Sequence, residues 1–332
     1  MRCLVTGGAG FIGSHLTEHL IGLGHEVTVL DDLSTGSVHN LAAVASSPKL
    51  RFVCGSIRDE AAVAKCVADV DAVYHLAAAV GVFTILDSTL ESLRTNLTGT
   101  EIVLEAALRR HARILVASTS EVYGKNTTVG LREDDDRILG SPLKNRWSYA
   151  EAKAVDETLT YLYGAQRGLD AVLVRLFNTV GPRQAGRYGM VVPRFVDQAL
   201  AGEPLTVFGT GEQTRCFCHV LDIVPALVAL LADDSAHGTV YNLGNPEQVS
   251  IAELAAKVIE ATGSSSDIVR VPYAQAYGAG YEDMQRRVPD CTRAREQIGF
   301  RPARNLAETL ESVIASRRSL RSARRPAAVA GQ

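Results

Sequence analysis

Two kinds of apolar pattern alternate along this chain. Short apolar runs predict buried strands at residues 2–6, 26–30, 50–54, 72–76, 113–117 and 171–177. Segments with a helical apolar period predict helices at residues 14–23, 60–68, 92–110 and 149–166. Strands and helices therefore take turns, which is typical of an α/β fold built around a parallel sheet.

The first strand is joined to the first helix by a turn that holds Gly7, Gly10 and Gly13. Gly7 permits a tight turn, Gly10 lets the main chain approach a pyrophosphate, and Gly13 lets the helix pack close to the strand. Asp31 ends the second strand, at about the spacing of a carboxylate that binds the ribose hydroxyls of adenosine. A carboxylate there repels a 2′-phosphate, so the pattern favours NAD over NADP. The alternative interpretation is a βα turn with no ligand.

The pattern changes after residue 177, where Gly, Pro and Arg become frequent. A strand is expected at 205–208, residues 239–244 are expected to return to the sheet, and Ser250 can cap a helix at 250–262. We therefore expect a Rossmann-type doubly wound parallel sheet with a smaller, interleaved C-terminal lobe. The expected division is a nucleotide-binding domain at 1–177 with a returning segment at about 219–247, a second lobe at 178–218 and 248–316, and a flexible tail at 317–332.

Tyr149 and Lys153 lie one turn apart at the start of a predicted helix, so their side chains share a face. A tyrosine with a pKa of about 10 is a poor base, but a neighbouring ammonium and a positive nicotinamide ring would stabilise its phenolate. Tyr149 could then take a proton from a sugar hydroxyl while hydride leaves the same carbon for NAD⁺. The alternative is a core tyrosine beside a lysine with a buried alkyl chain.

Composition excludes several other classes of protein. The 332 residues are 46% apolar and carry a net charge of −3, without a basic stripe that would indicate nucleic-acid binding. The longest apolar stretch, 224–232, is far shorter than the roughly 20 residues of a membrane span. The acidic run 133–136 is expected to be solvated on a surface loop.

Six scattered cysteines, in a chain that opens directly on a strand, favour a reducing, cytoplasmic setting. Cys216, Cys218 and His219 invite a metal interpretation, but a second ligand pair at zinc spacing is missing. Neighbouring residues on a strand also point to opposite faces. We therefore expect buried thiols and no metal.

Three local motifs carry a family resemblance. They are Thr119-Ser120-Glu121-Val122-Tyr123-Gly124, Gln213-Thr214-Arg215 and Gln285-Arg286-Arg287-Val288-Pro289-Asp290. With the glycine turn and the Tyr149–Lys153 pair, the chain resembles an extended short-chain dehydrogenase/reductase of the NAD-dependent epimerase/dehydratase family from Arg2 to about Ser316. Within that family it is most similar to the UDP-glucuronic acid decarboxylases, which form UDP-xylose or its 4-keto precursor.

The residues after Thr119 separate the reactions of this family. A 4,6-dehydratase protonates a departing hydroxyl and usually has Asp where this chain has Ser120, which is a poor acid. A simple 4-epimerase usually has a small residue where Glu121 stands. A decarboxylase oxidises C4, so that the C6 carboxylate lies β to a ketone and leaves as CO₂. The resemblance therefore implies decarboxylation of UDP-glucuronic acid.

The resemblance also implies a role for each matching residue. The catalytic group is Thr119, Ser120, Glu121, Tyr149, Lys153 and Arg287. The residues expected to bind NAD are Gly7, Gly10, Phe11, Ile12, Gly13, Asp31, Asp32, Ser56, Ile57, Leu76, Ala77, Ala78, Asn96, Tyr149 and Lys153. The residues expected to bind the UDP-sugar are Asn178, Val192, Phe208, Gln213, Arg215 and Arg287, with Ser120, Glu121 and Arg287 around the carboxylate and C5.

Two departures from the family pattern keep other readings open. Ser56 replaces a common acidic residue near the adenine, and the loops at 80–85 and 187–189 leave the C5 substituent of the substrate open. The first alternative is a 4-epimerase of UDP-glucuronate or another UDP-hexose. A second is a regulator that binds NAD without catalysis. The resemblance further implies a homodimer formed through the helices at 92–110 and 149–166.

Overall fold

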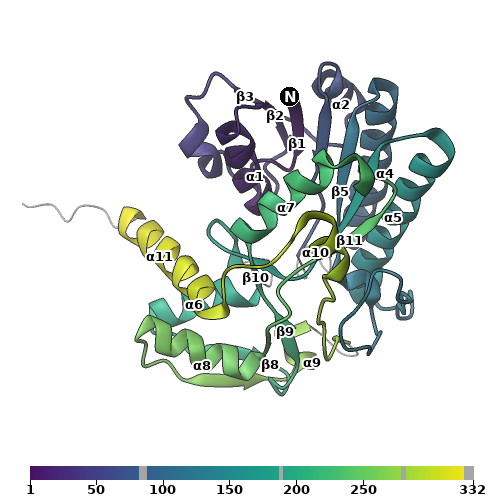
Figure 1. The fold of residues 1–332 in the computed structure, drawn as a ribbon. Helices are drawn as coiled ribbons and strands as arrows, with labels where there is room; N and C mark the ends of the chain where they lie inside the picture. The colour runs from purple at the N-terminus through teal and green to yellow at the C-terminus, as the bar shows by residue number, and fades with distance from the viewer. Residues whose placement is uncertain (82–87, 187–189, 278–281, 325–332) are drawn as a thin grey trace, which may run out of the picture.

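The computed structural model of the protein describes residues 1–81, 88–186, 190–277 and 282–324. A seven-stranded parallel sheet lies at its centre, with the strand order β11-β6-β5-β4-β1-β2-β3 (Figure 1). The expected doubly wound α/β fold is therefore confirmed. The strands of this sheet are β1 (Arg2–Thr6), β2 (Glu26–Asp31), β3 (Leu50–Cys54), β4 (Ala72–His75), β5 (Arg113–Thr119), β6 (Ala171–Leu176) and β11 (Val240–Leu243).

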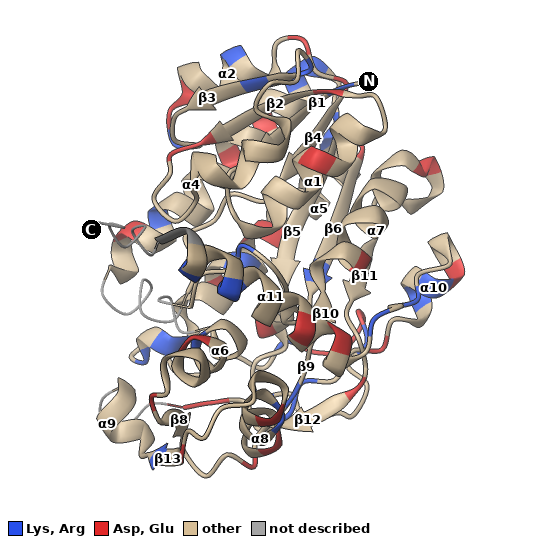
Figure 2. Ribbon diagram, turned by 90° about the vertical axis from the view of Figure 1, so that its left-hand side faces the viewer, with Lys and Arg blue, Asp and Glu red and all other residues tan. Residues whose placement is uncertain are grey.

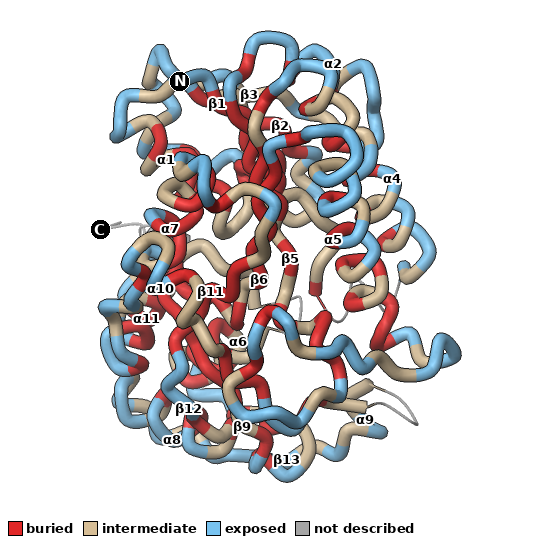
Figure 3. The backbone as a smooth tube through the Cα atoms, turned by 45° about the vertical axis from the view of Figure 1, so that its right-hand side comes forward, coloured by how far each residue is buried: buried red, intermediate tan, exposed pale blue. Residues whose placement is uncertain are grey.

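Helices cover both faces of the sheet because successive strand residues point to opposite sides. Val5 packs in the same cluster as Leu16 of α1 and Leu227 of α7, whereas its neighbour Leu4 packs with Leu104 of α4. The buried sheet runs through the middle of the upper part of the molecule (Figure 3). The helices around it are α1 (Phe11–Gly22) and α7 (Val220–Ala232) on one face, and α2 (Glu60–Val67), α4 (Thr89–Arg110) and α5 (Ser148–Arg167) on the other.

A second group of elements lies below the central sheet (Figure 1). Its core joins segments far apart in sequence, such as Phe195, Leu254 and Leu310. Its main elements are α6 (Val191–Ala201), α8 (Ile251–Thr262) and α11 (Leu306–Arg324), with the strand pairs β7 (Thr179–Val180) with β10 (Cys218–His219), β8 (Leu205–Phe208) with β13 (Ile268–Val271), and β9 (Thr214–Cys216) with β12 (Gln248–Ser250). The expected boundaries between the two lobes stay a prediction.

The remaining elements are short. They are the 3-10 helices η1 (Val38–Val44), η2 (Ser120–Tyr123), η3 (Asn145–Trp147) and η5 (Asp234–Ala236), and the helices α9 (Tyr273–Tyr277) and α10 (Thr292–Ile298). Acidic and basic segments are interspersed over the ribbon (Figure 2). Within the four described ranges, no helix has the length and apolar character needed to cross a membrane.

Three local expectations can be compared directly with the structure. Ser250 caps α8 as expected, in a capping box with Glu253. The tail expected from residue 317 is wrong for 317–324, because α11 continues to Arg324 and Arg317 pairs with Asp197 of α6. Residues 325–332 lie outside the described part. The acidic run is not wholly solvated either, since Glu133 is buried and accepts a hydrogen bond from the backbone N–H of Asn242.

Candidate active site

The glycine turn has a geometry that larger residues could not adopt. Gly7 has a φ of +70°, and a Cβ on it would lie 2.9 Å from the backbone of Ala77. A Cβ on Gly13 would lie only 2.1 Å from the carbonyl oxygen of Gly7. The turn therefore brings the main chain close to β4 and leaves the N-terminus of α1 open to a ligand.

Asp31 fixes this turn from the end of β2. Its Oδ2 accepts a hydrogen bond from the Ala9 N–H at 2.9 Å, and its Oδ1 accepts one from the Leu33 N–H at 2.8 Å. Burial raises the pKa of Asp31, and the two backbone bonds oppose that shift. Asp31 still lines the cavity, so the carboxylate is where a ribose hydroxyl could reach it.

A cavity of about 520 Å³ runs from the glycine turn to the ends of β5 and β6, a volume within the range of small-molecule sites. Twelve of the fifteen residues expected to bind NAD are on its wall. They are Gly7, Gly10, Phe11, Ile12, Gly13, Asp31, Asp32, Ile57, Leu76, Ala77, Ala78 and Tyr149. Ser56, Asn96 and Lys153 are not.

Ser56, Asn96 and Lys153 lie outside the lining of this cavity. Both polar atoms of the Asn96 side chain bond the backbone of Ala79, at 2.8 and 3.2 Å, and so support the loop after β4. The Ser56 hydroxyl accepts a hydrogen bond from the Arg58 N–H. Lys153 is 2% exposed. Direct contacts of these side chains with NAD stay a prediction.

A second cavity opens beside the first, between the sheet and the smaller group of elements. All six residues expected to bind the UDP-sugar line it: Asn178, Val192, Phe208, Gln213, Arg215 and Arg287. Glu121, Tyr149, Asn178 and Arg287 line both cavities. The sequence-predicted catalytic residues Thr119 and Ser120 line the first. Most of the predicted catalytic residues therefore lie close to the junction of the two cavities.

Glu121 faces two arginines at this junction. Its Oε2 lies 2.7 Å from the nearest guanidinium nitrogen of Arg146, and its Oε1 lies 3.4 Å from one of Arg287. Burial alone would raise the pKa of Glu121, but Arg146 and Arg287 outweigh burial and bring the pKa down to about 2. Glu121 is therefore charged at neutral pH.

Arg287 connects three predicted site residues. Its guanidinium donates to Asn178 Oδ1 at 2.8 Å and to the Ser120 hydroxyl at 3.2 Å, besides facing Glu121. Its Nε is buried and has no hydrogen-bond partner. Burial lowers the pKa of Arg287 to about 10, against the opposing effect of Glu121. A cationic group with remaining donor capacity suits an anionic part of a substrate.

Tyr149 is partly buried and lies near two carboxylates. Burial raises its pKa most strongly, and the carboxylates of Glu121 and Asp156 add to the rise. Lys153 does not oppose this rise, and its ammonium pairs with Asp156 at 2.9 Å. Any shift of the phenol towards neutral pH must therefore come from a further positive charge beside it.

The expected phosphate ligands already have protein partners. Arg215 makes a two-pronged contact with Asp283 at 2.9 Å to each oxygen, and the Tyr273 hydroxyl also donates to Asp283. The Asn178 amide donates to the Cys216 carbonyl, and its φ of +31° is unusual for a residue other than glycine. Contacts of Arg215 and Asn178 with a diphosphate stay a prediction.

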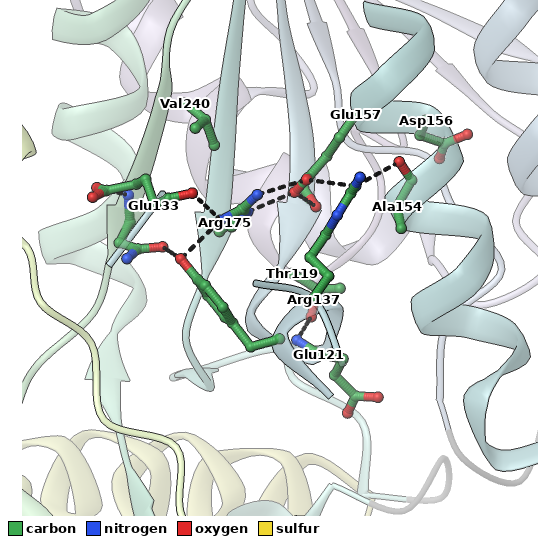
Figure 4. Close-up of polar contacts among 12 residues, drawn as sticks. Thr119, Glu121, Glu133, Arg137, Ala154, Asp156, Glu157, Arg175 and Val240 are labelled. Carbon is green, nitrogen blue, oxygen red and sulfur yellow. Dashed lines mark hydrogen bonds and ion pairs between the residues drawn. The ribbon is translucent and has the colours of Figure 1, made fainter. Parts of the chain in front are cut away.

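A buried polar network fixes the elements that carry these residues (Figure 4). Arg175 of β6 donates to both oxygens of Glu157 of α5 at 2.8 Å, and to the Tyr123 hydroxyl of η2 at 2.9 Å. Ser118 of β5 also donates to Glu157, at 2.6 Å. The network therefore ties the helix of Tyr149 to the segment of Thr119 and Glu121.

Sequence reasoning missed several members of the site. Arg146, Tyr273 and Asp283 line the second cavity, and nothing in the spacing of the chain singles them out. Arg146 stands three residues before Tyr149, and η3 turns it back towards Glu121. The parts of the two loops at 82–85 and 187–189 lie outside the described residues.

The cysteines near the site are buried thiols, as expected. Burial raises the pKa of the Cys216 thiol to about 12, and it raises that of Cys218 well above the ordinary value. All six cysteines are free of disulfides. In the described ranges no three residues of the His, Cys, Asp and Glu types are grouped so that they could hold a metal ion.

Comparison with known proteins gives consistent results. The family model described as "NAD dependent epimerase/dehydratase family" matches residues 3–244. A UDP-N-acetyl-alpha-D-glucosaminuronate decarboxylase of Bacillus cytotoxicus is 42% identical over 315 residues, which cover 94% of this chain and 96% of the relative. UDP-glucuronic acid decarboxylase 1 of Xenopus tropicalis is 39% identical over 94% of this chain and 71% of the relative. The UDP-glucuronic acid 4-epimerase of Bacillus cereus, solved with UDP-glucuronic acid and NAD, superposes with a TM-score of 0.87 at 28% identity, over 96% of this chain and 100% of that one.

Proposed function

The chain belongs to the NAD dependent epimerase/dehydratase family, and within it we propose that the protein is an NAD-dependent decarboxylase of UDP-glucuronic acid. The product is UDP-xylose, UDP-4-keto-xylose or both. The observation that carries the proposal is the cluster of Ser120, Glu121 and Arg287 around the junction that Tyr149 also lines. The decarboxylases among the relatives, at 37–42% identity, support it.

The glycine turn fits the cofactor of this family. The close approach at Gly7 and Gly13 leaves no room for a Cβ, so main-chain N–H groups at the start of α1 can meet a pyrophosphate. Asp31 would hold ribose hydroxyls, and Phe11, Ile12, Ile57 and Leu76 would form apolar walls. When bound, NAD supplies a hydride acceptor for oxidation at C4 and then a hydride donor for reduction.

The residues of this chain handle the proton and the carboxylate. Tyr149 accepts the proton of the C4 hydroxyl, and Thr119 at the end of β5 hydrogen-bonds the C4 oxygen. Oxidation at C4 makes the C6 carboxylate β to a ketone. The C5–C6 bond then breaks, CO₂ leaves, and the electron pair remains on C5 as an enolate that Arg287 stabilises. C5 then takes a proton from solvent to give the 4-keto-pentose, and Tyr149 returns its proton to the C4 oxygen if the ketone is reduced. Because Glu121 is charged, its role is to hold Arg146 and Arg287.

Mass spectrometry of the nucleotide sugar tests this proposal. Purified protein incubated with UDP-glucuronate and NAD⁺ is expected to release a product lighter by one CO₂. Loss of one CO₂ alone corresponds to UDP-xylose, in which the ketone has been reduced before release, whereas a product lighter by a further two hydrogens is UDP-4-keto-xylose. A product of unchanged mass would instead establish the 4-epimerase, which the resemblance to the Bacillus cereus structure also favours. Binding of NAD without any change in UDP-glucuronate would contradict both reactions.

The substituent at C2 of the sugar is open to a second test. One of the relatives, at 42% identity, acts on the N-acetylated sugar acid, whereas the relatives named for UDP-glucuronic acid are 35–39% identical. Competition between UDP-glucuronate and its 2-acetamido counterpart in one reaction, followed by mass, measures the ratio of kcat/KM directly. Because UDP-glucuronate is the proposed substrate, a ratio above one is expected for it, and a ratio below one would identify the 2-acetamido sugar acid as the preferred substrate.

We further propose that the protein is a homodimer in the cytoplasm. Exposed apolar side chains on α5, Val155, Tyr161 and Leu162, support assembly through α4 and α5, which pack against each other. The six free cysteines support a reducing compartment. Light scattering of the purified protein and fractionation of cells test the two statements separately.

A further inference from the structure

The catalytic lysine candidate is held by a carboxylate of its own helix. Lys153 Nζ lies 2.9 Å from Oδ2 of Asp156, three residues further along α5, and the two side chains are 2% and 1% exposed. Lys153 does not line the cofactor cavity, although Tyr149 one turn earlier does. The ammonium is therefore directed to the interior of the protein.

Asp156 is not part of the structural network beside it. Its neighbour Glu157 points to Arg175 and Arg137, whereas Asp156 points away from that cluster (Figure 4). The second carboxylate oxygen of Asp156, Oδ1, is buried without a hydrogen-bond partner. A buried carboxylate with an unused oxygen is unfavourable for folding, so its presence beside a site residue calls for a functional reason.

Ionisable side chains from several elements set the electrostatic environment of Tyr149. Glu121 of η2 is balanced by Arg146 of η3 and by Arg287, which precedes α10. His75 of β4 is buried, and burial together with Lys153 lowers its pKa to about 3, so it is neutral near physiological pH. The remaining charged pair near Tyr149 is therefore Lys153 with Asp156 on α5.

We propose that Asp156 is a positioning residue for the Tyr149–Lys153 pair: its carboxylate holds the Lys153 ammonium and cancels much of the positive charge that would otherwise act on the Tyr149 phenol. This inference rests on the proposed function, in which Tyr149 exchanges the C4 proton. Its consequence is that the protein needs a higher pH for turnover than the same chain with a neutral residue at 156.

The test observes Tyr149 directly. The NAD-saturated protein, labelled with carbon-13 at tyrosine Cζ, is titrated by NMR, and the Tyr149 signal is identified by its loss in Tyr149→Phe. In Asp156→Asn the apparent pKa of Tyr149 is expected to fall by roughly one unit, since a nearby negative charge is removed. The acid limb of the pH profile of kcat/KM is expected to move by the same amount.

Glu151→Gln is the matched control, because it removes a carboxylate from the same helix and leaves the partner of Lys153 in place. Its Tyr149 titration is expected to match the wild type, and Asp156→Glu, which restores the charge, is expected to do the same.

If Asp156→Asn does not fold, Asp156→Ser removes the same charge with less bulk. A folded neutral variant with an unchanged Tyr149 titration overturns the inference. If the wild type converts no UDP-sugar, the proposed function fails, and the NMR titration still decides the role of Asp156.

Discussion

Glu121 can remain charged in a buried site because two guanidinium groups face its two oxygens. Its pKa of about 2 lies below the ordinary value of 4.5, since the arginines outweigh the effect of burial. A neutral substitute would leave both arginines without their carboxylate. The residue is therefore better understood as the anchor of two cations than as an acid.

The pH dependence of stability tests this role of Glu121. A carboxyl whose folded pKa is lowered contributes stability that is complete above its unfolded pKa and is lost as the pH falls through the folded value. The lower melting temperature expected for Glu121→Gln at pH 7 should therefore approach that of the wild type as the pH falls from 4.5 towards 2. Calorimetry of both proteins across this range measures the difference. A constant difference would contradict the charged state assigned to Glu121.

Tyr149→Phe separates catalysis from binding. The substitution removes only the phenolic oxygen, so turnover is expected to fall by about 10²–10⁴-fold, the usual contribution of a general acid–base group. Binding of NAD, followed by isothermal titration calorimetry, is expected to stay close to the wild type because the ring remains. Full turnover by Tyr149→Phe would contradict the assignment and would favour a protein in which NAD has only a regulatory role.

At the scale of residues, the sequence predicts side chains that belong to a motif and misses those that depend on a fold contact. Tyr149 and Lys153 follow from their spacing, and Thr119 to Glu121 follow from the end of a strand. Arg146 and Asp283 belong to no spacing pattern, because Arg146 lies on the short 3-10 helix η3 and Asp283 lies on a segment without regular structure. The pairing of Lys153 with Asp156 was also unexpected, since a helix offers partners at both three and four residues.

Helix α5 is fixed to the sheet by the contact of Glu157 with Arg175. Their side chains are 6% and 7% exposed, so each charge depends on the other. Because α5 carries Tyr149 and β5 leads into Glu121, a loss of this contact would loosen two parts of the site together. The network therefore stabilises the packing of whole elements, and its effect is not limited to one residue.

Arg175→Met is expected to lower the free energy of unfolding by about 3–5 kcal/mol, because it leaves the Glu157 carboxylate buried without its main partner. Urea unfolding monitored by circular dichroism measures this change. The matched control is Arg167→Met at the end of the same helix, whose contact with Glu105 is partly exposed, with side chains 48% and 26% exposed. Its effect is expected to be a small fraction of that of Arg175→Met. Equal effects would show that burial does not decide the contribution of these pairs.

The sequence predicts elements with a clear period and misses elements without one. The six strands from β1 to β6 and the helices α4 and α5 were expected within a few residues. The segment at 224–232 is apolar almost throughout, so its sequence does not show which side of a helix would be buried, yet it lies in α7, which packs against the sheet beside α1. Helix α11 continues to Arg324 because arginines such as Arg317 and Arg321 bond neighbouring carboxylate or carbonyl oxygens. Those tertiary contacts are invisible in a local pattern.

At the scale of the whole molecule, the proposed dimer rests on exposed apolar side chains of α5. Val155 and Leu162 lie seven residues apart on α5, which places them on one helix face, and they are 46% and 37% exposed. The double variant Val155→Glu with Leu162→Glu is expected to convert a dimer into a monomer, because four carboxylates would meet across a symmetric contact. Leu221→Glu on α7, where the side chain is 44% exposed, is the control and should leave the proposed dimer intact.

Sedimentation velocity distinguishes the monomer from the dimer. A wild-type protein that sediments as a monomer at micromolar concentration would rule out the α5 contact, whereas a double variant that stays dimeric would move the interface to another face.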